Sequence, residues 1–307
     1  MSADHKTLEA DRSFERYLAG RAALVESYLD RYLPPESAPP ETISRAVRYS
    51  LFAGGKRLRP VMVLAAAEAV GGDVEDALPA AAAFEMIHTY SLIHDDLPAM
   101  DDDSLRRGRP TSHVVFGEAI AILAGDALQT HAFAVLADPP PPCRVPAERR
   151  LRAVADLASA AGAGGMVGGQ VLDLESEAKP VDAATLERIH RHKTGALIRA
   201  TVRVGAIVAG ASEEDLSRLT RFGEEAGLAF QIVDDILDIE GNEATLGKSA
   251  GKDARSGKAT YPLVHGVAEA RRKAAELVCS ALRRLEPFGA AGRPLALLAE
   301  HMIRRSS

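Results

Sequence analysis

Five aspartates lie within nine residues, and this acidic stretch limits what the chain can fold into more than any other feature. They are Asp95, Asp96, Asp101, Asp102 and Asp103, and the basic segment Leu105-Arg106-Arg107-Gly108-Arg109-Pro110 follows almost at once. Neighbouring carboxylates repel one another, so a folded chain needs a reason to gather them. Divalent metal ions supply that reason, because they prefer carboxylate oxygens as ligands.

A second acidic patch, Asp234-Asp235-Ile236-Leu237-Asp238, follows an apolar run far downstream. At helical spacing Asp234 and Asp238 lie one turn apart on one face, which suits two oxygen ligands on one ion. Two such patches facing each other would hold several Mg²⁺ ions, and several Mg²⁺ ions usually indicate a diphosphate. We expect the rest of the chain to supply cations and an apolar pocket.

Composition indicates a globular protein, since 47% of the 307 residues are apolar and 26% are charged. The net charge of -6 argues against a nucleic-acid partner, whose binding would need basic patches. No apolar run approaches the roughly 20 residues of a membrane span, so none is expected. The charged segment Met1–Asp11 lacks the apolar centre of a secretory signal, which favours the cytoplasm. Cys143 and Cys279 are expected to be free thiols.

The pattern of residues predicts an all-α fold, because alanine, leucine, glutamate and arginine dominate and runs with period-2 alternation are scarce. Helices are expected over residues 12–33, 41–52, 60–70, 76–97, 118–136, from 148 onward, 182–209, 213–239 and twice more after 262. The proline run at 139–142 predicts a stiff surface loop near 138–147 within a single domain spanning 1–307. The glycine cluster over 162–169 predicts a kink or a close packing point.

Pro98 is expected to end the helix inside the first acidic stretch. Asp95 and Asp101 are six residues apart, which is about 240° around an undisturbed helix. The two side chains could not share one ion without this break.

The stretch from Ser91 to Gly108 resembles the first aspartate-rich motif of the trans-prenyl diphosphate synthases, and Asp234–Asp238 resembles the second. The family's other signatures are matched in the same order by Gly54-Gly55-Lys56-Arg57-Leu58-Arg59-Pro60, Gly169-Gln170-Val171-Leu172-Asp173-Leu174, His192-Lys193-Thr194-Gly195 and Gly257-Lys258-Ala259-Thr260-Tyr261-Pro262. The match runs from about Glu41 onward, with 1–40 less well matched, and is closest to bacterial farnesyl diphosphate synthases. It implies a homodimer of helical bundles, each with about ten or more helices around a deep central pocket.

The resemblance also implies a role for each matched residue. Asp95, Asp101 and Asp234 would hold about three Mg²⁺ ions on an allylic diphosphate, with Asp96 and Asp238 as nearby partners. Isopentenyl diphosphate would bind without metal, at Lys56, Arg59, His88 and Arg107 beside Gly55. The allylic diphosphate would also contact Arg106, Lys193, Lys248 and Lys258, while Thr194 and Gln231 offer oxygen dipoles to a carbocation.

Two of these assignments have independent support from spacing. His88 lies seven residues before Asp95 and therefore on the same helical face. Gln231 precedes Asp234 by three residues and shares its face. His190 and His192 are not taken as metal ligands, because side chains two residues apart diverge on a helix.

The implied reaction is a dissociative prenyl transfer, in which the allylic carbon–oxygen bond ionises and the isopentenyl double bond attacks the cation. The protein would contribute positioning, neutralisation of charge and exclusion of water. In the family, the residues four and five positions before the first aspartate close the pocket floor, and here they are Ser91 and Tyr90. An aromatic Tyr90 predicts a farnesyl product.

Alternative functions differ in the features they require. A geranylgeranyl diphosphate synthase shares every motif and is disfavoured by Tyr90 alone. A terpene cyclase has no need of the basic site at Lys56 and Arg59. A non-catalytic partner subunit typically lacks one aspartate motif, and this chain has both. A structural acidic bundle that only buffers divalent ions would not explain Lys193-Thr194 or the Gly-Lys-Arg loop.

Overall fold

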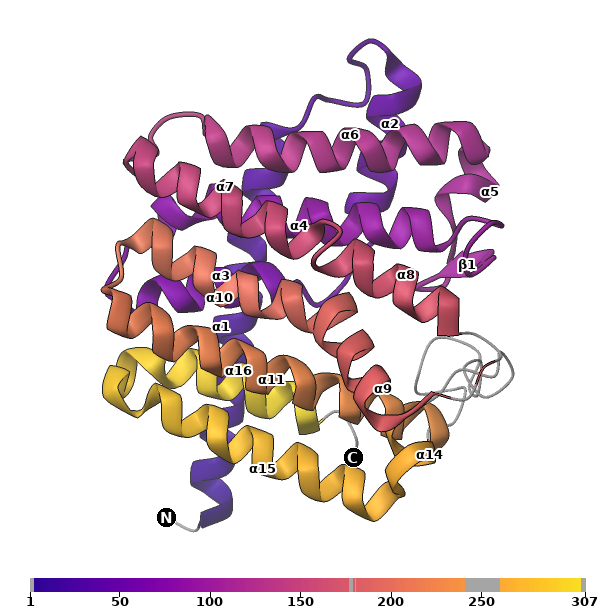
Figure 1. Ribbon diagram of the computed structural model, residues 1–307. Helices are drawn as coiled ribbons and strands as arrows, with labels where there is room; N and C mark the ends of the chain where they lie inside the picture. Colours follow the sequence, from indigo (N-terminus) through magenta and orange to yellow (C-terminus); the bar gives the residue numbers. More distant parts are fainter. Residues whose placement is uncertain (1–2, 177–178, 180, 241–259, 305–307) are drawn as a thin grey trace.

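The computed structural model describes residues 3–176, 179, 181–240 and 260–304. These residues form a bundle of helices, and their one sheet is a hairpin of two short strands (Figure 1). The predicted all-α fold is confirmed.

The first part of the chain contains α1 (Ala3–Tyr32), α2 (Glu41–Leu51), α3 (Leu58–Ala69), α4 (Val74–Asp95), β1 (Leu105–Arg106), β2 (Arg109–Pro110), α5 (Ser112–Phe116) and α6 (Glu118–Ala137). The second part contains α7 (Ala147–Ala161), α8 (Met166–Ser176), α9 (Ala183–His190), the π-helical turn η1 (Arg191–Gly195), α10 (Ala196–Ala209), α11 (Glu213–Glu240), α14 (Tyr261–His265), α15 (Val267–Leu285), the 3₁₀ segment η2 (Glu286–Gly292) and α16 (Arg293–Arg304).

The core is built on α3, α4 and α10. The run from Val61 to Ala67 is apolar on all sides and fully buried, which is the pattern of a helix surrounded by others. α3 packs against α4 and α10, α6 covers α4, and α11 and α7 cover α10. In Figure 1 the hairpin, α8, α9 and α14 lie along one side of the molecule, on the right of the view.

Helix ends agree closely with the sequence predictions for α2, α3, α6 and α11 but differ elsewhere. α1 begins at Ala3 and not near residue 12, and three α-helices, α14, α15 and α16, occupy the C-terminal region where two were predicted. α4 ends at Asp95, slightly before the predicted end near Leu97. The single helix predicted over 182–209 is wrong in its middle, where the π-helical turn η1 separates α9 from α10. A π-helical turn holds an extra residue relative to an α-helix, and such turns often occur at functional sites.

Among the described residues, α6 is the one helix long and apolar enough to cross a membrane. Core helices of globular proteins meet the same criterion, and α6 packs against α4, α2, α5 and α7. Its opposite face is apolar and open, since Ile122 and Leu123 are 43% and 53% exposed.

Candidate active site

The first acidic stretch folds back on itself directly after α4. Asp96 ends the helix two residues before Pro98, and the next residues form a turn. The backbone amide of Asp101 donates to the carbonyl of Asp95 at 2.8 Å, and that of Asp103 donates to Asp96 at 3.2 Å. Asp102 takes the left-handed conformation, with φ of 50°, that this return requires. The break therefore brings Asp101 next to Asp95, as the spacing argument required.

Asp95 carries a charge that its surroundings do not fully balance. Burial raises the pKa of its carboxyl to about 6, and Asp101 and Asp96 add to the rise, while Lys193 and Arg106 oppose it. A carboxylate held this way binds either a proton or a cation, so the donor set at this turn fits a divalent metal ion.

Asp96 is bound to Arg106 of the hairpin. Its side chain is 5% exposed, and Arg106 Nε lies 2.8 Å and 2.9 Å from its two carboxylate oxygens. Arg106 also lies 3.8 Å from Asp103. Asp96 therefore fixes the hairpin to the end of α4, and its expected role beside the metal ligands stays a prediction.

The hairpin aims Arg106 and Arg107 in different directions. Arg106 pairs with Arg109 across the strands, so Arg107 and Gly108 form the two-residue turn, with φ of 53° and 74°. This is the pattern of a type I′ turn, in which both central residues need positive φ. Arg107 Nη1 reaches across to donate to the carbonyl of Gly54.

Gly55 is a glycine for a steric reason. A Cβ there would lie 2.5 Å from Nη1 of Arg107, and its φ of 128° also suits glycine. The absent side chain of Gly55 therefore leaves room for the guanidinium group of Arg107.

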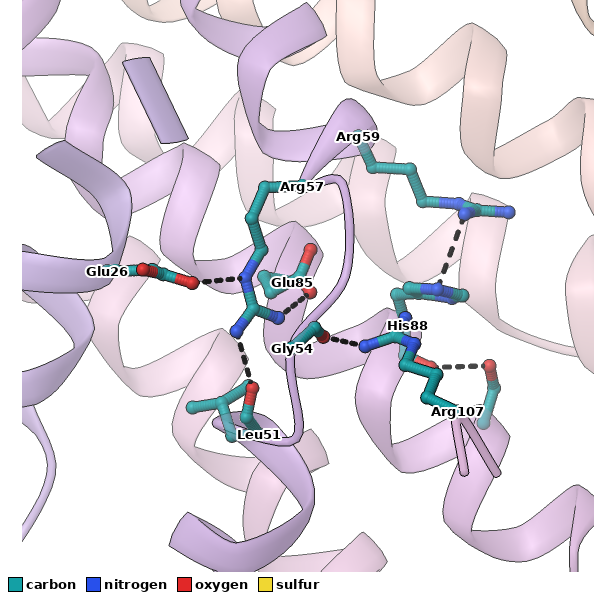
Figure 2. A network of polar contacts seen from close by, with 9 residues as sticks. Glu26, Leu51, Gly54, Arg57, Arg59, Glu85, His88 and Arg107 are labelled. Carbon is teal, nitrogen blue, oxygen red and sulfur yellow. Dashed lines mark hydrogen bonds and ion pairs between the residues drawn. The ribbon is translucent and has the colours of Figure 1, made fainter. Parts of the chain in front are cut away.

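Three cationic or imidazole groups from separate segments meet beside this loop (Figure 2): Arg59 of α3, His88 of α4 and Arg107 of the hairpin. His88 Nε2 lies 3.5 Å from Arg59 Nη1. Burial, and then the charges of Arg59 and Arg107, hold the pKa of His88 well below its usual range, so its imidazole is neutral. Lys56 is exposed on the same loop. We call Lys56, Arg59, His88 and Arg107 the basic cluster.

Lys193 lies in η1, which is held between two helices. A Cβ at Gly169 of α8 would collide with the backbone of Lys193, and one at Gly227 of α11 would come within 3.1 Å of Gly195. Lys193 Nζ donates to Asp173 Oδ2 at 2.6 Å. Asp173 belongs to the motif Gly169–Leu174. Its acidic side chain within that motif was the sequence signal for a partner of Lys193.

The second acidic patch is divided between two environments on α11. Asp234 is exposed and Asp238 is partly exposed, but Asp235 turns to the other side. Its Oδ2 lies 3.0 Å from His190 Nε2 and accepts from the backbone amide of Tyr261 at 2.6 Å. Sequence analysis did not identify Asp235 and His190 as a pair, and its exclusion of His190 from the metal ligands stays a prediction.

The two acidic patches do not form a preassembled metal site. Among the described residues, no group of three or more histidine, cysteine or acidic side chains is close enough to hold an ion. Asp95 meets Asp101, while joint ligation with Asp234 or Asp238 stays a prediction. Lys248 and Lys258 lie outside the described residues.

Tyr90 and Ser91 occupy α4 one turn before Asp95. Tyr90 is 5% exposed and packs edge-on against His94, with ring centroids 5.7 Å apart. Burial, and then Asp95, raise the pKa of Tyr90 to about 12. Ser91 donates to the carbonyl of His88 at 2.8 Å. Thr194 and Gln231 are partly exposed, on η1 and α11.

An all-helical bundle with this arrangement is the fold of the isoprenyl diphosphate synthases. The chain belongs to the polyprenyl synthetase family, whose model matches residues 40–287.

Individual relatives agree with this assignment. The chain is 50% identical over 297 residues to farnesyl diphosphate synthase of Escherichia coli, covering 95% of this chain and 99% of that one. It is 47% identical over 303 residues to geranylgeranyl diphosphate synthase of Cyanophora paradoxa, covering 98% and 100%. The apo crystal structure of an FPP/GFPP synthase from Zymomonas mobilis superposes with a TM-score of 0.86 at 37% identity, covering 95% and 99%. The family predicted from the aspartate-rich motifs is confirmed, and the predicted enzyme type agrees with these names.

Proposed function

We propose that this protein is a prenyltransferase that condenses isopentenyl diphosphate with dimethylallyl and then geranyl diphosphate to give farnesyl diphosphate. One observation carries the proposal: α4 bears His88 of the basic cluster and, seven residues later, Asp95 of the acidic turn. A basic and an acidic site on one helical face suit two diphosphates, one bound by cations of the protein and one bound through metal.

The basic cluster is the proposed site of isopentenyl diphosphate. Arg59 and Arg107 present guanidinium groups, which bind phosphate oxygens in pairs. His88 is neutral, so it contributes hydrogen bonding without adding a charge that would have to be buried. Gly55 and Lys56 complete the loop on the exposed side.

The acidic turn is the proposed site of the allylic diphosphate. Asp95 and Asp101, with Asp234 and the neighbouring Asp96 and Asp238, would hold about three Mg²⁺ ions, which neutralise the leaving diphosphate when bound. Arg106, Lys193, Lys248 and Lys258 would contact the same diphosphate. Lys193 suits this role because its charge already acts on Asp95 and because Asp173 fixes its position.

The remaining residues act on the reacting carbons. Thr194 and Gln231 would direct oxygen dipoles toward the cation, since neutral oxygens stabilise positive charge without trapping it covalently. The proton lost after attack would pass to the departing diphosphate. Tyr90 and Ser91 would close the pocket floor and limit the product to farnesyl length.

The second candidate is a geranylgeranyl diphosphate synthase, which the Cyanophora relative favours by name. It differs from the first only in the space beyond Tyr90. The terpene cyclase and partner-subunit alternatives are weaker, because the basic cluster and both acidic motifs are present together.

A product assay tests the proposal. Purified protein is incubated with Mg²⁺, dimethylallyl diphosphate and excess labelled isopentenyl diphosphate, and the dephosphorylated alcohols are separated by chain length. Farnesol as the main alcohol supports the proposal, while geranylgeraniol keeps the reaction and rejects the Tyr90 stop. Folded protein that incorporates no label rejects the elongation activity.

A cytoplasmic homodimer is proposed on family grounds. The exposed apolar side chains Val114 and Val115 of α5 and Ile122 and Leu123 of α6 offer a face for a second copy of the chain. Analytical ultracentrifugation should give twice the chain mass of 32.6 kDa, and Leu123→Glu should shift it toward the monomer. A monomeric wild-type protein would reject this part.

A further inference from the structure

Arg57 stands in the middle of the basic loop, yet its side chain is buried. The residue is 3% exposed, whereas its neighbour Lys56 is exposed. Its backbone is left-handed, with φ of 50° and ψ of 33°, at the position just before α3 begins. A non-glycine residue in this conformation is uncommon, and such residues gather at functional sites. The sequence motif placed Arg57 between Lys56 and Arg59, and no role was assigned to it there.

Each nitrogen of the Arg57 guanidinium group donates to a protein acceptor (Figure 2). Nη1 reaches Glu85 Oε1 at 2.5 Å, Nε reaches Glu26 Oε1 at 3.1 Å, and Nη2 reaches the carbonyl of Leu51 at 2.8 Å. These acceptors belong to α4, α1 and the end of α2 respectively. Arg57 therefore joins the loop to three helices at one point.

Glu85 explains why the guanidinium group stays inside. The glutamate is itself 3% exposed, and a buried carboxylate requires a close opposite charge. With both charges paired, Arg57 is committed to the protein and does not face the diphosphate. Figure 2 shows Arg57 and Arg59 pointing to different sides of the loop, with Arg59 directed to His88.

Glu85 also lies three residues before His88 on α4, so the two share a helical face. We infer that Arg57 is a positioning residue. Paired with Glu85, it holds the loop so that Lys56 and Arg59 lie beside His88, and it thereby sets the affinity for isopentenyl diphosphate. The inference rests on the proposed function, because it concerns how that basic cluster is assembled.

Methionine substitutions of the pair separate this role from direct binding. Arg57→Met leaves the buried Glu85 carboxylate unpaired, and Glu85→Met leaves Arg57 with the half-exposed Glu26 as its charge partner, whereas the double variant removes both members of the buried pair. We expect each single change to raise the KM for isopentenyl diphosphate about tenfold or more, with the KM for geranyl diphosphate changed less than about threefold. The double variant should be no worse than the worse single variant, because the two changes act on one interaction.

A second ion pair, remote from the loop, serves as the control. Arg203 of α10 binds Asp156 of α7 through two bonds of 3.0 Å. Arg203→Met should lower Tm without changing the ratio of the two KM values. A loss of stability alone therefore cannot imitate the expected result.

Two results would overturn the inference. If Arg57→Met raises the KM for isopentenyl diphosphate while Glu85→Met leaves it within about twofold, the pair with Glu85 does not position the loop and the inference fails. If both KM values rise together, as the result of general loosening, the pair supports only stability. Should Arg57→Met fail to fold, Glu85→Met and the double variant still decide between these outcomes. If the wild-type protein incorporates no isopentenyl diphosphate, the proposed function is rejected. If the wild type is active and the variants have unchanged KM values, only the role of the pair is rejected.

Discussion

His190 Nε2 lies 3.0 Å from Asp235 Oδ2, and the same oxygen accepts the backbone amide of Tyr261 at 2.6 Å. This one carboxylate thus links α9, α11 and the start of α14. Because a carboxylate only accepts hydrogen bonds, His190 Nε2 carries the proton. Asp235 turns away from the side that Asp234 presents, so the pair fixes how α11 is rotated within the bundle.

Removal of this link is expected to weaken both stability and metal-dependent activity. His190→Leu leaves the partly buried carboxylate of Asp235 with one partner fewer and should cost about 1–3 kcal/mol of unfolding free energy. His190→Gln can place an amide N–H near the same oxygen and should recover most of the loss. Urea unfolding and the Mg²⁺ dependence of kcat would measure the two effects. If the Gln and Leu variants are equally impaired, the hydrogen bond to Asp235 is not the cause.

Arg107→Asn tests the hairpin. Asparagine accepts positive φ far more readily than arginine, so the turn should be kept and gain about 1 kcal/mol. The guanidinium group is lost, and the KM for isopentenyl diphosphate should rise about 10- to 100-fold with little change for the allylic substrate.

Arg109 provides the matched control on the same hairpin. Its guanidinium group stacks 4.6 Å from the ring of Tyr49 instead of joining the basic cluster. Arg109→Gln should therefore leave the KM for isopentenyl diphosphate within about threefold. Equal effects at both positions would mean that the hairpin's placement matters and not the Arg107 guanidinium group.

Asp95 should make the metal-free protein less stable above pH 6. Its pKa of about 6 in the folded state exceeds the ordinary value of 3.8, so the folded state holds the proton more tightly. The raised pKa therefore favours folding as the pH falls through 6 toward 4 and opposes it above 6. Asp95→Asn cannot ionise and should be about 2 kcal/mol more stable than wild type at pH 7.5 in EDTA, with a smaller difference at pH 4.5. Urea unfolding at both pH values measures this, and a difference independent of pH would contradict it.

Mg²⁺ with inorganic diphosphate should reverse that order. Ligands that bind only the folded state stabilise it, and they need the ionised Asp95. Wild-type protein should then gain more in Tm than Asp95→Asn does. Below pH 6 the apparent metal affinity should fall about tenfold per pH unit, because protons compete for the carboxylate. Equal gains in the two proteins would remove Asp95 from the ligand set.

Tyr90→Ala should lengthen the product, because it removes a buried ring from the proposed pocket floor. Geranylgeraniol should replace farnesol as a main alcohol in the product assay. Tyr90→Phe is the control that keeps the ring. In the described structure the buried Tyr90 hydroxyl has no hydrogen-bond partner, so its loss should leave the product unchanged and stability equal or up to about 1 kcal/mol higher. An unchanged product in Tyr90→Ala would remove the ring from the control of chain length.

Much of the fold could be predicted from local signals. The glycines and prolines that bound α3 and α4 act on neighbouring backbone, so helix ends followed from the sequence. The return of Asp101 to Asp95 followed from Pro98 and helical geometry. The π-helical turn could not be predicted in this way, because it depends on Gly169 and Gly227 of two other helices.

The residue types of the candidate site could be predicted from the sequence, but the directions in which its side chains point could not. Arg57 and Arg59 look alike in the basic loop, and only burial against Glu85 separates them. Asp234 and Asp235 are adjacent, yet one is exposed and the other binds His190. Such differences depend on long-range partners that a linear pattern does not contain.

The turn η1 also fixes how α10 is rotated about the helix axis relative to α9. A π-helical turn is an α-helix with one residue inserted, so every residue after it is rotated by about 100° relative to an uninterrupted helix. The insertion lets α9 present His190 to α11 while α10 still turns its apolar residues into the core. Deleting one residue from 191–195 would produce a more regular helix and put one of these two faces out of register. The irregular turn therefore allows one continuous helical segment to pack against two surfaces that face different directions.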